Sequence, residues 1–234
     1  MAARVAIEFR EVIAGVLLAG GQSRRMFAHG GGGAAEGATG DKGLLELDGR
    51  PMLSHVIERL GPQVGALALN ANGDPARFAP FGLPVIADTV AGYAGPLAGV
   101  LSGLRWAARD CSSTRYVLTA STDAPFLPGD LAERLMSALE AEPALGGRRI
   151  ALARSQGHLH PVIGLWPVDL AADLEQALGS GVRKVLAWTD RHGTLGVDFP
   201  PVRFGGTEVD PFFNANTPAE LDEARRLLEL VASA

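Results

Sequence analysis

An apolar run that ends in two glycines lies near the start of the chain, where residues 12–21 read VIAGVLLAGG. A short continuous apolar run bounded by glycine is typical of a buried strand in a parallel sheet. The run is far shorter than the roughly 20 apolar residues of a membrane span. Glu8 and Glu11 also lie where a signal peptide needs net positive charge. The stretch therefore predicts a buried strand over residues 13–19 that leads into a glycine turn.

Similar apolar runs recur along the chain, and each is followed by a loop and by a stretch in which apolar residues return every three or four positions. This alternation is typical of a parallel sheet wrapped by helices. The predicted strands are residues 13–19, 66–70, 85–88, 116–121, 150–153 and 162–166. The predicted helices are residues 52–60, 97–108, 131–140, 170–178, 183–189 and 218–232. We therefore expect an α/β fold with a doubly wound, mostly parallel, Rossmann-like sheet.

Length and composition are those of one globular domain, which we expect to span residues 1–234. The chain is 47% hydrophobic and 20% charged, and its net charge of -5 provides no basic field for a polyanion. Nucleic acid and membrane are therefore not expected as partners. Cys111 is the only cysteine, which excludes an intramolecular disulfide and a cysteine-rich metal framework. A cytoplasmic location is expected because the cytoplasm is reducing.

Glycines and basic residues follow the first predicted strand, in the order Gly20, Gly21, Arg25 and Lys42. Glycines at the carboxyl end of a strand let backbone N–H groups approach an anion, and the two cations add positive charge. This order predicts a cradle for a triphosphate, whereas a tight structural turn is the alternative for the glycine pair alone. The Walker A motif is excluded because Asp41 stands where that motif requires glycine.

Several short motifs occur in a fixed order along the chain. They are Leu-Ala-Gly-Gly at 18–21, Ser-Arg-Arg-Met at 23–26, Asp-Lys-Gly at 41–43, Leu-Asn-Ala-Asn at 69–72, Gly-Pro-Leu-Ala-Gly at 95–99, Asp-Ala-Pro-Phe at 123–126, His-Pro at 160–161 and Asn-Ala-Asn-Thr-Pro at 214–218. Together they resemble the molybdenum cofactor guanylyltransferases, over nearly the entire chain. The resemblance implies a nucleotidyltransferase fold and transfer of GMP from GTP to molybdopterin with release of pyrophosphate.

The resemblance also implies roles for individual residues. It places the nucleotide on Leu18, Ala19, Gly20, Gly21, Lys42, Asn70, Asp88 and Asp123. It makes Arg25, Lys42 and Asp123 the catalytic residues, with Asp123 as the ligand of a Mg²⁺ cofactor. The GTP part then covers about residues 11–125, and the molybdopterin part about residues 150–217, with His160, Asn214 and Asn216 as candidate pterin contacts. Expected partners are GTP, molybdopterin and, transiently, molybdenum-insertion proteins or recipient molybdoenzymes.

Three of these residues can be interpreted independently of the resemblance. Asn70 and Asp88 end predicted strands, and Asp123 follows the strand at residues 116–121. Because ligands of open parallel sheets bind at the carboxyl edge, we expect all three beside the glycine cradle. A carboxylate there can accept from guanine N–H groups or a ribose hydroxyl, and Mg²⁺ binds one or two carboxylates plus substrate phosphates. Ordinary turn chemistry remains the alternative for each residue.

Two features do not follow directly from this scheme. His158 and His160 are spaced to share one face of a strand, but a third metal ligand is not near them in sequence. Residues 27–40 are a glycine-rich tract between Arg25 and Lys42, where similar sequences have only a few residues. The tract predicts a loop, and it leaves the spatial distance between the two cations open.

Three alternative functions remain. Two are enzymes, a cytidylyltransferase for the same pterin and a sugar-phosphate nucleotidyltransferase. In the resembling cytidylyltransferases the cradle usually reads Leu-Ala-Ala-Gly, so Gly20 leaves the room that a purine needs. The third is a GTP-binding module without catalysis, against which the presence of both Lys42 and Asp123 argues.

Overall fold

A computed structural model of the chain describes residues 9–19, 41–90, 95–142, 149–204 and 206–232. Three predicted site residues, Gly20, Gly21 and Arg25, lie outside these ranges, and so does the glycine-rich tract at residues 27–40. The other predicted site residues are all described.

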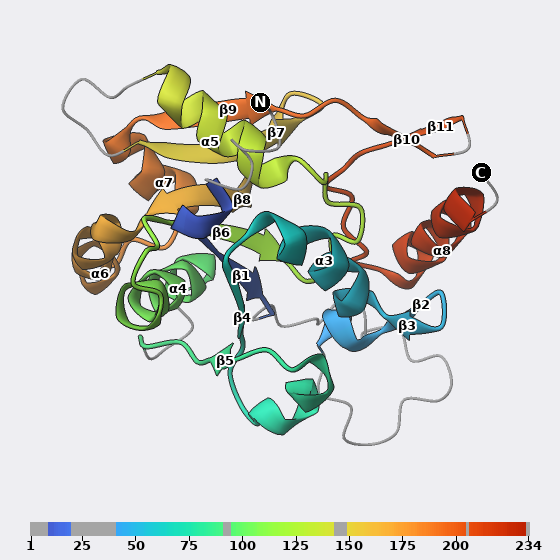
Figure 1. Cartoon of the computed structure of the whole chain (residues 1–234), viewed down its shortest axis with the longest axis horizontal. Coiled ribbons are helices and arrows are strands. Elements are labelled where there is room, and N and C mark those ends of the chain that lie inside the picture. Colours follow the sequence, from blue (N-terminus) through green and yellow to red (C-terminus); the bar gives the residue numbers. More distant parts are fainter. Residues whose placement is uncertain (1–8, 20–40, 91–94, 143–148, 205, 233–234) are drawn as a thin grey trace.

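A seven-stranded sheet forms the centre of the molecule in the order β5-β4-β1-β6-β8-β7-β9 (Figure 1). Its strands are β1 (Ile13–Leu18), β4 (Ala66–Asn70), β5 (Val85–Ile86), β6 (Tyr116–Ser121), β7 (Ile150–Ser155), β8 (His158–Pro167) and β9 (Thr194–Asp198). β8 is antiparallel to its neighbours β6 and β7, whereas the other strand pairs are parallel. The predicted doubly wound, mostly parallel α/β fold is confirmed.

Helices cover both faces of this sheet. Those against one face are α3 (Met52–Leu60) and α5 (Leu131–Ala141), and those against the other are α4 (Pro96–Asp110), α6 (Ala171–Gly179) and α7 (Val185–Thr189). β1 shows why its sequence is a continuous apolar run: Ile13 and Leu17 pack in the first layer, whereas Ala14 and Val16 pack in the second. A strand between two helical layers needs apolar side chains on both sides.

The last helix, α8 (Pro218–Ala232), packs in a smaller cluster of its own. The apolar face of α8 packs there against Leu47 and Met52 through Leu221, Ala224 and Leu227. These contacts lie next to the hairpin of β2 (Glu46–Leu47) and β3 (Arg50–Pro51). The carboxyl-terminal helix is therefore fixed beside the segment that follows Lys42. A second small hairpin, β10 (Val202–Phe204) with β11 (Thr207–Val209), leads toward it.

The structure corrects several predicted boundaries. The strand expected at residues 162–166 begins at His158, because Gln156 and Gly157 form a tight turn that pairs Ser155 with His158. Both turn residues have positive φ, 48° and 80°, as a two-residue type I′ hairpin requires. β5 ends at Ile86 rather than at residue 88, and α7 begins at Val185 rather than at residue 183. The short strands β2, β3, β9, β10 and β11 were not predicted.

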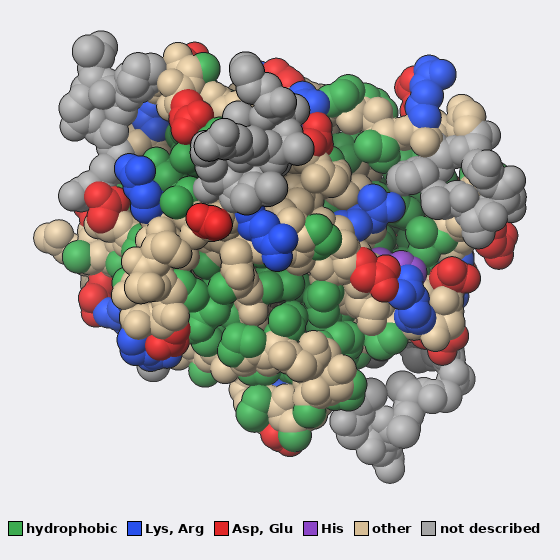
Figure 2. Space-filling view, in the orientation of Figure 1, with side chains coloured by type: hydrophobic (Ala, Val, Ile, Leu, Met, Phe, Trp, Pro, Cys, Tyr) green, Lys and Arg blue, Asp and Glu red, His purple; other side chains and the backbone are tan. Residues whose placement is uncertain are grey.

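The surface carries charges of both signs. On the face shown in Figure 2, acidic and basic side chains of the described residues are interspersed over the middle and the sides, while hydrophobic ones gather in its lower middle part. Within the described ranges, none of the helices is long and apolar enough to cross a membrane.

Candidate active site

The carboxyl ends of three neighbouring strands lie at the same level of the sheet. In the pairing register, Leu18 of β1 stands between Asn70 of β4 and Ser121 of β6. The backbone N–H of Ala19 donates to the Asn70 carbonyl at 2.9 Å, which extends the pairing past the end of β1. Residues that leave these strands, including Asp123, therefore start from one common edge.

A carboxylate and two amides form a cluster at the β4 and β5 end of this edge. The amide of Asn70, a residue only 3% exposed, donates to Asp88 Oδ1 at 3.0 Å and to the Ile86 carbonyl at 3.1 Å. Asn72 donates to Asp88 Oδ2 at 2.7 Å and accepts the Asp88 backbone N–H at 2.9 Å. Asp88 thus has a fixed orientation although it lies beyond the end of β5. The sequence motif at 69–72 contained Asn72, but its role was missed.

Lys42 is positioned by the residues on either side of it. It begins the short 3₁₀ helix η1 (Lys42–Leu44), and the carboxylate of Asp41 accepts from Arg77 Nε at 2.5 Å. Arg77 also donates to the Asn72 carbonyl at 2.7 Å. On the other side, a Cβ at Gly43 would lie 2.9 Å from Thr122 Cβ, so this turn packs directly on the loop after β6. Sequence reasoning missed Arg77, because nothing in its local pattern predicts its partner.

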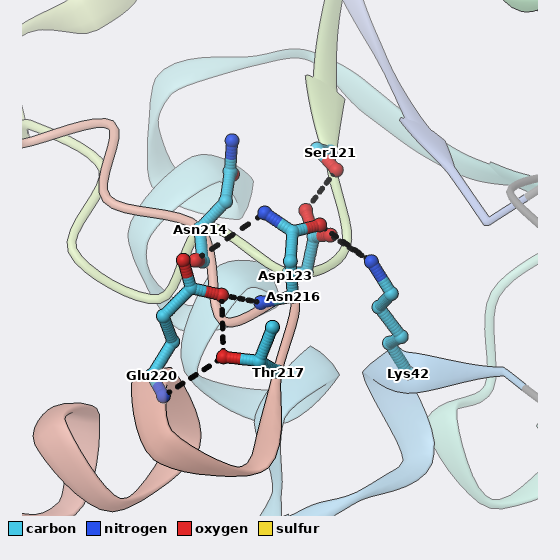
Figure 3. A network of polar contacts seen from close by, with 7 residues as sticks. All are labelled: Lys42, Ser121, Asp123, Asn214, Asn216, Thr217 and Glu220. Atoms are coloured by element: carbon cyan, nitrogen blue, oxygen red, sulfur yellow. Dashed lines mark hydrogen bonds and ion pairs between the residues drawn. The ribbon is translucent and has the colours of Figure 1, made fainter. Parts of the chain in front are cut away.

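The turn brings Lys42 to two of the predicted site residues (Figure 3). Its Nζ donates to Asn216 Oδ1 at 2.5 Å and lies 3.5 Å from Asp123 Oδ2. The Lys42 and Asp123 side chains are only 18% and 14% exposed. Ser121 Oγ donates to the other carboxylate oxygen of Asp123. Since an ammonium group has three N–H donors, these contacts leave one donor of Lys42 for a further acceptor.

The loop before α8 is docked on this group (Figure 3). The Ala215 backbone N–H donates to the Asp123 carbonyl at 3.1 Å. Thr217 and Glu220 cap the helix: the Glu220 backbone N–H donates to Thr217 Oγ1 at 3.2 Å, and the Glu220 carboxylate accepts the Asn216 backbone N–H at 2.8 Å. Asn214 Oδ1 is buried and has no hydrogen-bond partner among the described residues. The cap therefore fixes the segment that carries both asparagines.

His160 reaches the same edge through the antiparallel direction of β8. Because β8 begins where the parallel strands end, its first residues extend past the end of β6. His160 Nε2 is 2.7 Å from Ser155 Oγ, and burial lowers the pKa of the imidazole. His158 is exposed, and no metal-binding group of three His, Cys, Asp or Glu residues occurs in the described ranges. The two histidines thus lie next to each other along β8 at the site edge.

Mg²⁺ is usually bound by fewer protein ligands than other metal ions are. It keeps several waters and binds through one or two carboxylates plus substrate phosphates. The carboxylate of Asp123, partly exposed at the strand edge, is of the type that could serve as one such ligand. This donor set fits a Mg²⁺ ion that arrives with a nucleotide rather than one held by the protein alone.

The tryptophan and cysteine side chains are not part of this edge. The three tryptophans are at most 7% exposed and belong to the core: Trp106, Trp166 and Trp188. Cys111 follows α4 and precedes β6, near the amino ends of the strands. Burial raises the pKa of its thiol, and it packs against the α4 core layer.

Residues 15–194 match the family described as the MobA-like NTP transferase domain. A molybdenum cofactor guanylyltransferase of Bradyrhizobium sp. is 50% identical over 216 residues, which are 92% of each chain. One of Mesorhizobium japonicum is 47% identical over 96% of this chain and 100% of its own. The chain belongs to the molybdenum cofactor guanylyltransferase family. It is therefore a nucleotidyltransferase.

Solved structures show that the fold is shared beyond this guanylyltransferase family. Molybdopterin-guanine dinucleotide biosynthesis protein A of Archaeoglobus fulgidus superposes with a TM-score of 0.64 at 21% identity, over 93% of this chain and 98% of its own. A 4-diphosphocytidyl-2C-methyl-D-erythritol synthase of Anaerococcus prevotii superposes with a TM-score of 0.66 at 12% identity, over 96% and 99% of the two chains. Both likenesses concern the fold alone, which is the predicted nucleotidyltransferase fold.

Proposed function

We propose that this guanylyltransferase transfers GMP from GTP to molybdopterin and releases pyrophosphate. The observation that carries the proposal is the meeting of Lys42, Asp123 and Asn216 at one sheet edge, in line with Leu18 and the Asn70 strand end. A cation, a carboxylate and fixed amides at the edge of a parallel sheet are the groups that a nucleoside triphosphate with its metal requires.

In the proposed binding mode, the nucleoside lies at the β4 and β5 end of the edge. Asp88 is oriented by two amides, so its carboxylate can accept from guanine N–H groups or a ribose hydroxyl without rearranging. The phosphates extend along the end of β1 toward Lys42. The proposal also assigns to this phosphate site three residues outside the described ranges, Gly20, Gly21 and Arg25. Only their order in the sequence supports this assignment.

The reaction is a direct displacement. An oxygen of the terminal phosphate of molybdopterin forms a bond to the α-phosphorus of GTP, and the bond from that phosphorus to the bridging oxygen breaks. The electron pair leaves with pyrophosphate. The attacking phosphate is already ionised at neutral pH, so the step needs no general base. Positioning and charge neutralisation therefore carry most of the rate enhancement.

The residues have separate tasks in this step. Lys42 neutralises the charge that builds up on the leaving pyrophosphate, with the donor that Asp123 and Asn216 leave free. Asp123 would hold Mg²⁺, which when bound neutralises charge on the phosphate oxygens. Ser121 and the Ala215 backbone N–H keep the Asp123 segment in place.

The proposal is tested by pyrophosphate release from the full chain with Mg²⁺ and molybdopterin. We expect release with GTP and at least tenfold slower release with CTP, together with the formation of a guanine dinucleotide. Faster release with CTP would favour the pterin cytidylyltransferase. Tight GTP binding without release in the presence of molybdopterin would favour the non-catalytic GTP-binding module. Release with a sugar phosphate instead of molybdopterin would favour the sugar-phosphate nucleotidyltransferase.

A further inference from the structure

Three polar side chains from separate elements meet beside the candidate active site. Ser155 ends β7, His160 lies on β8, and Asp210 follows β11. Ser155 Oγ is 2.7 Å from His160 Nε2, and it is 2.8 and 3.0 Å from the two carboxylate oxygens of Asp210. Ser155 is 3% exposed. The proposed function gives no role to Ser155 or Asp210.

The number of hydrogens decides how this group is bonded. A hydroxyl has one hydrogen, and a carboxylate only accepts. Two carboxylate oxygens lie within 3.0 Å of Ser155 Oγ, so the serine hydrogen points to Asp210. Its oxygen is then an acceptor on the side of His160, which must donate through Nε2–H. The Asp210 carboxylate is itself fixed, because Oδ1 accepts the Phe212 backbone N–H at 2.9 Å.

This bonding determines what the other imidazole nitrogen can do. Burial lowers the pKa of His160, the nearby His158 lowers it further, and only Asp210 acts in the opposite direction. A neutral ring with its hydrogen on Nε2 carries a lone pair on Nδ1. Among the described residues, Nδ1 accepts no hydrogen bond. The ring is held in place by Phe212, whose centroid is 4.7 Å from that of the imidazole.

The arrangement is not that of a serine nucleophile. In a catalytic triad the carboxylate bonds the imidazole, and the imidazole takes the serine proton. Here Asp210 bonds the serine, and the serine hydrogen points away from the imidazole. The group therefore orients His160 and does not activate Ser155.

The location of His160 connects it with the reacting groups. β8 runs antiparallel to β6 with Thr119 opposite Gly164, so His160 lies beyond the level at which β6 ends, on the side of Asp123. The segment that begins at Asp210 also continues to Ala215 and Asn216, which bind the Asp123 carbonyl and Lys42. A group that binds His160 Nδ1 thus lies at the same edge as the phosphates.

We propose that Ser155 and Asp210 are positioning residues that hold His160 as its neutral Nε2–H tautomer, so that Nδ1 accepts a hydrogen bond from an N–H group of the pterin. The inference rests on the proposed function: the pterin, like guanine, offers ring and amino N–H donors, and the nucleoside is placed at the β4 and β5 end of the edge, beside Asp88. The hydrogen bond to Nδ1 would recognise molybdopterin, the molecule that receives GMP, rather than the nucleotide.

The tautomer is tested by ¹⁵N NMR of the full chain, with the His160 signals assigned by comparison with H160Q. We expect a protonated Nε2 and an unprotonated Nδ1 at neutral pH. In D210A the serine hydrogen is released to Nε2, so the imidazole hydrogen should shift to Nδ1. A wild-type Nδ1–H signal, or a D210A spectrum unchanged from the wild type, would overturn the proposal.

Kinetics provide a second, independent readout. We expect S155A to raise the KM for molybdopterin about tenfold, with the GTP dissociation constant unchanged, because one hydrogen bond to the imidazole is lost. S155T keeps the hydroxyl and should restore the KM, and S113A, at the opposite sheet edge, serves as the matched control. An S155A variant with a normal KM for molybdopterin, or with an equal loss of GTP affinity, would contradict the assignment. Absence of GMP transfer by the wild type would refute the proposed function and leave the tautomer result standing.

Discussion

Lys42 Nζ donates a hydrogen bond to Asn216 Oδ1 at 2.5 Å, although 174 positions separate the two residues in the chain. The sequence placed one of them in the GTP part and the other among the pterin contacts. Because Asn216 contacts Lys42, we expect it to act on the nucleotide side as well, through the orientation of Lys42. The two expected parts of the chain therefore meet at this hydrogen bond.

Replacement of Lys42 tests the phosphate site. We expect Lys42→Ala to lower kcat/KM for GTP about 10²-fold or more, as for the loss of one preorganised electrostatic contact. The measurement is the steady-state rate of pyrophosphate release. Arg203→Ala, which removes an exposed cation paired with Glu208, is the control and should keep the wild-type value. An unchanged kcat/KM in Lys42→Ala would remove this residue from the phosphate site.

Replacement of Asn216 tests whether this residue orients Lys42 in addition to its expected contact with the pterin. We expect Asn216→Ala to weaken GTP binding several-fold even when molybdopterin is absent, because Lys42 loses the acceptor that orients it. A titration of the protein with GTP measures this directly. In a double-mutant cycle with Lys42→Ala, the two losses should be less than additive, with a coupling of about 0.5–3 kcal/mol. Unaltered GTP affinity would return Asn216 to a pterin contact only.

Replacement of Asp123 tests the metal site. We expect Asp123→Ala to abolish turnover while circular dichroism shows an intact fold, since the carboxylate is partly exposed and belongs to a loop. Asp130→Ala, which removes an exposed carboxylate at the start of α5 that pairs with Arg134, is the matched control. Near-normal GMP transfer by folded Asp123→Ala at saturating Mg²⁺ would show that another group holds the metal.

Arg77 is expected to act on Lys42 from a distance. It connects Asp41 with the Asn72 carbonyl, so it ties the Lys42 turn to the loop that orients Asp88. We expect Arg77→Ala to raise the KM for GTP about tenfold, the equivalent of about 1.4 kcal/mol, with a smaller change in kcat. Steady-state kinetics at several GTP concentrations separate the two constants. A fall in kcat alone would place Arg77 in a different role.

The tight turn of the β7–β8 hairpin predicts a stabilising change. Gln156 has a φ of 48°, a conformation that asparagine adopts more readily than glutamine. We expect Gln156→Asn to raise the free energy of unfolding by about 0.5 kcal/mol, which corresponds to about 1–2 °C in Tm for a chain of this size. Thermal unfolding followed by circular dichroism measures the shift. A lower Tm would mean that the glutamine side chain makes a stabilising contact that asparagine cannot replace.

The strands and helices that the sequence predicted best are those whose pattern is local and strong. β1 is apolar throughout because it lies between two helical layers, and α8 carries its own cap in Thr217 and Glu220. The start of β8 was missed because His158 and its neighbours lack an apolar alternation, and the turn before them depends on backbone angles rather than on composition.

The sequence predicted only part of the candidate site, because only some of its residues have a local signal. Asn70 and Asp123 could be placed because they end or follow strands that share an edge. Arg77, Asn72 and Ser155 could not, because each acts through a partner that is distant in sequence or held by a loop. Pairings of this kind arise from tertiary packing and leave no periodic signal in the chain.

Cys111 lies at the opposite end of β6 from Asp123, across a strand of six residues, or about 20 Å. Because the chain contains one cysteine, a maleimide dye can be attached at a single known place without any engineering. The raised pKa of the thiol means that labelling will be slow near neutral pH and faster in mild alkali. Because a dye there would lie at the other end of β6 from the proposed substrate site, we expect energy transfer to a fluorescent nucleotide to report binding in real time.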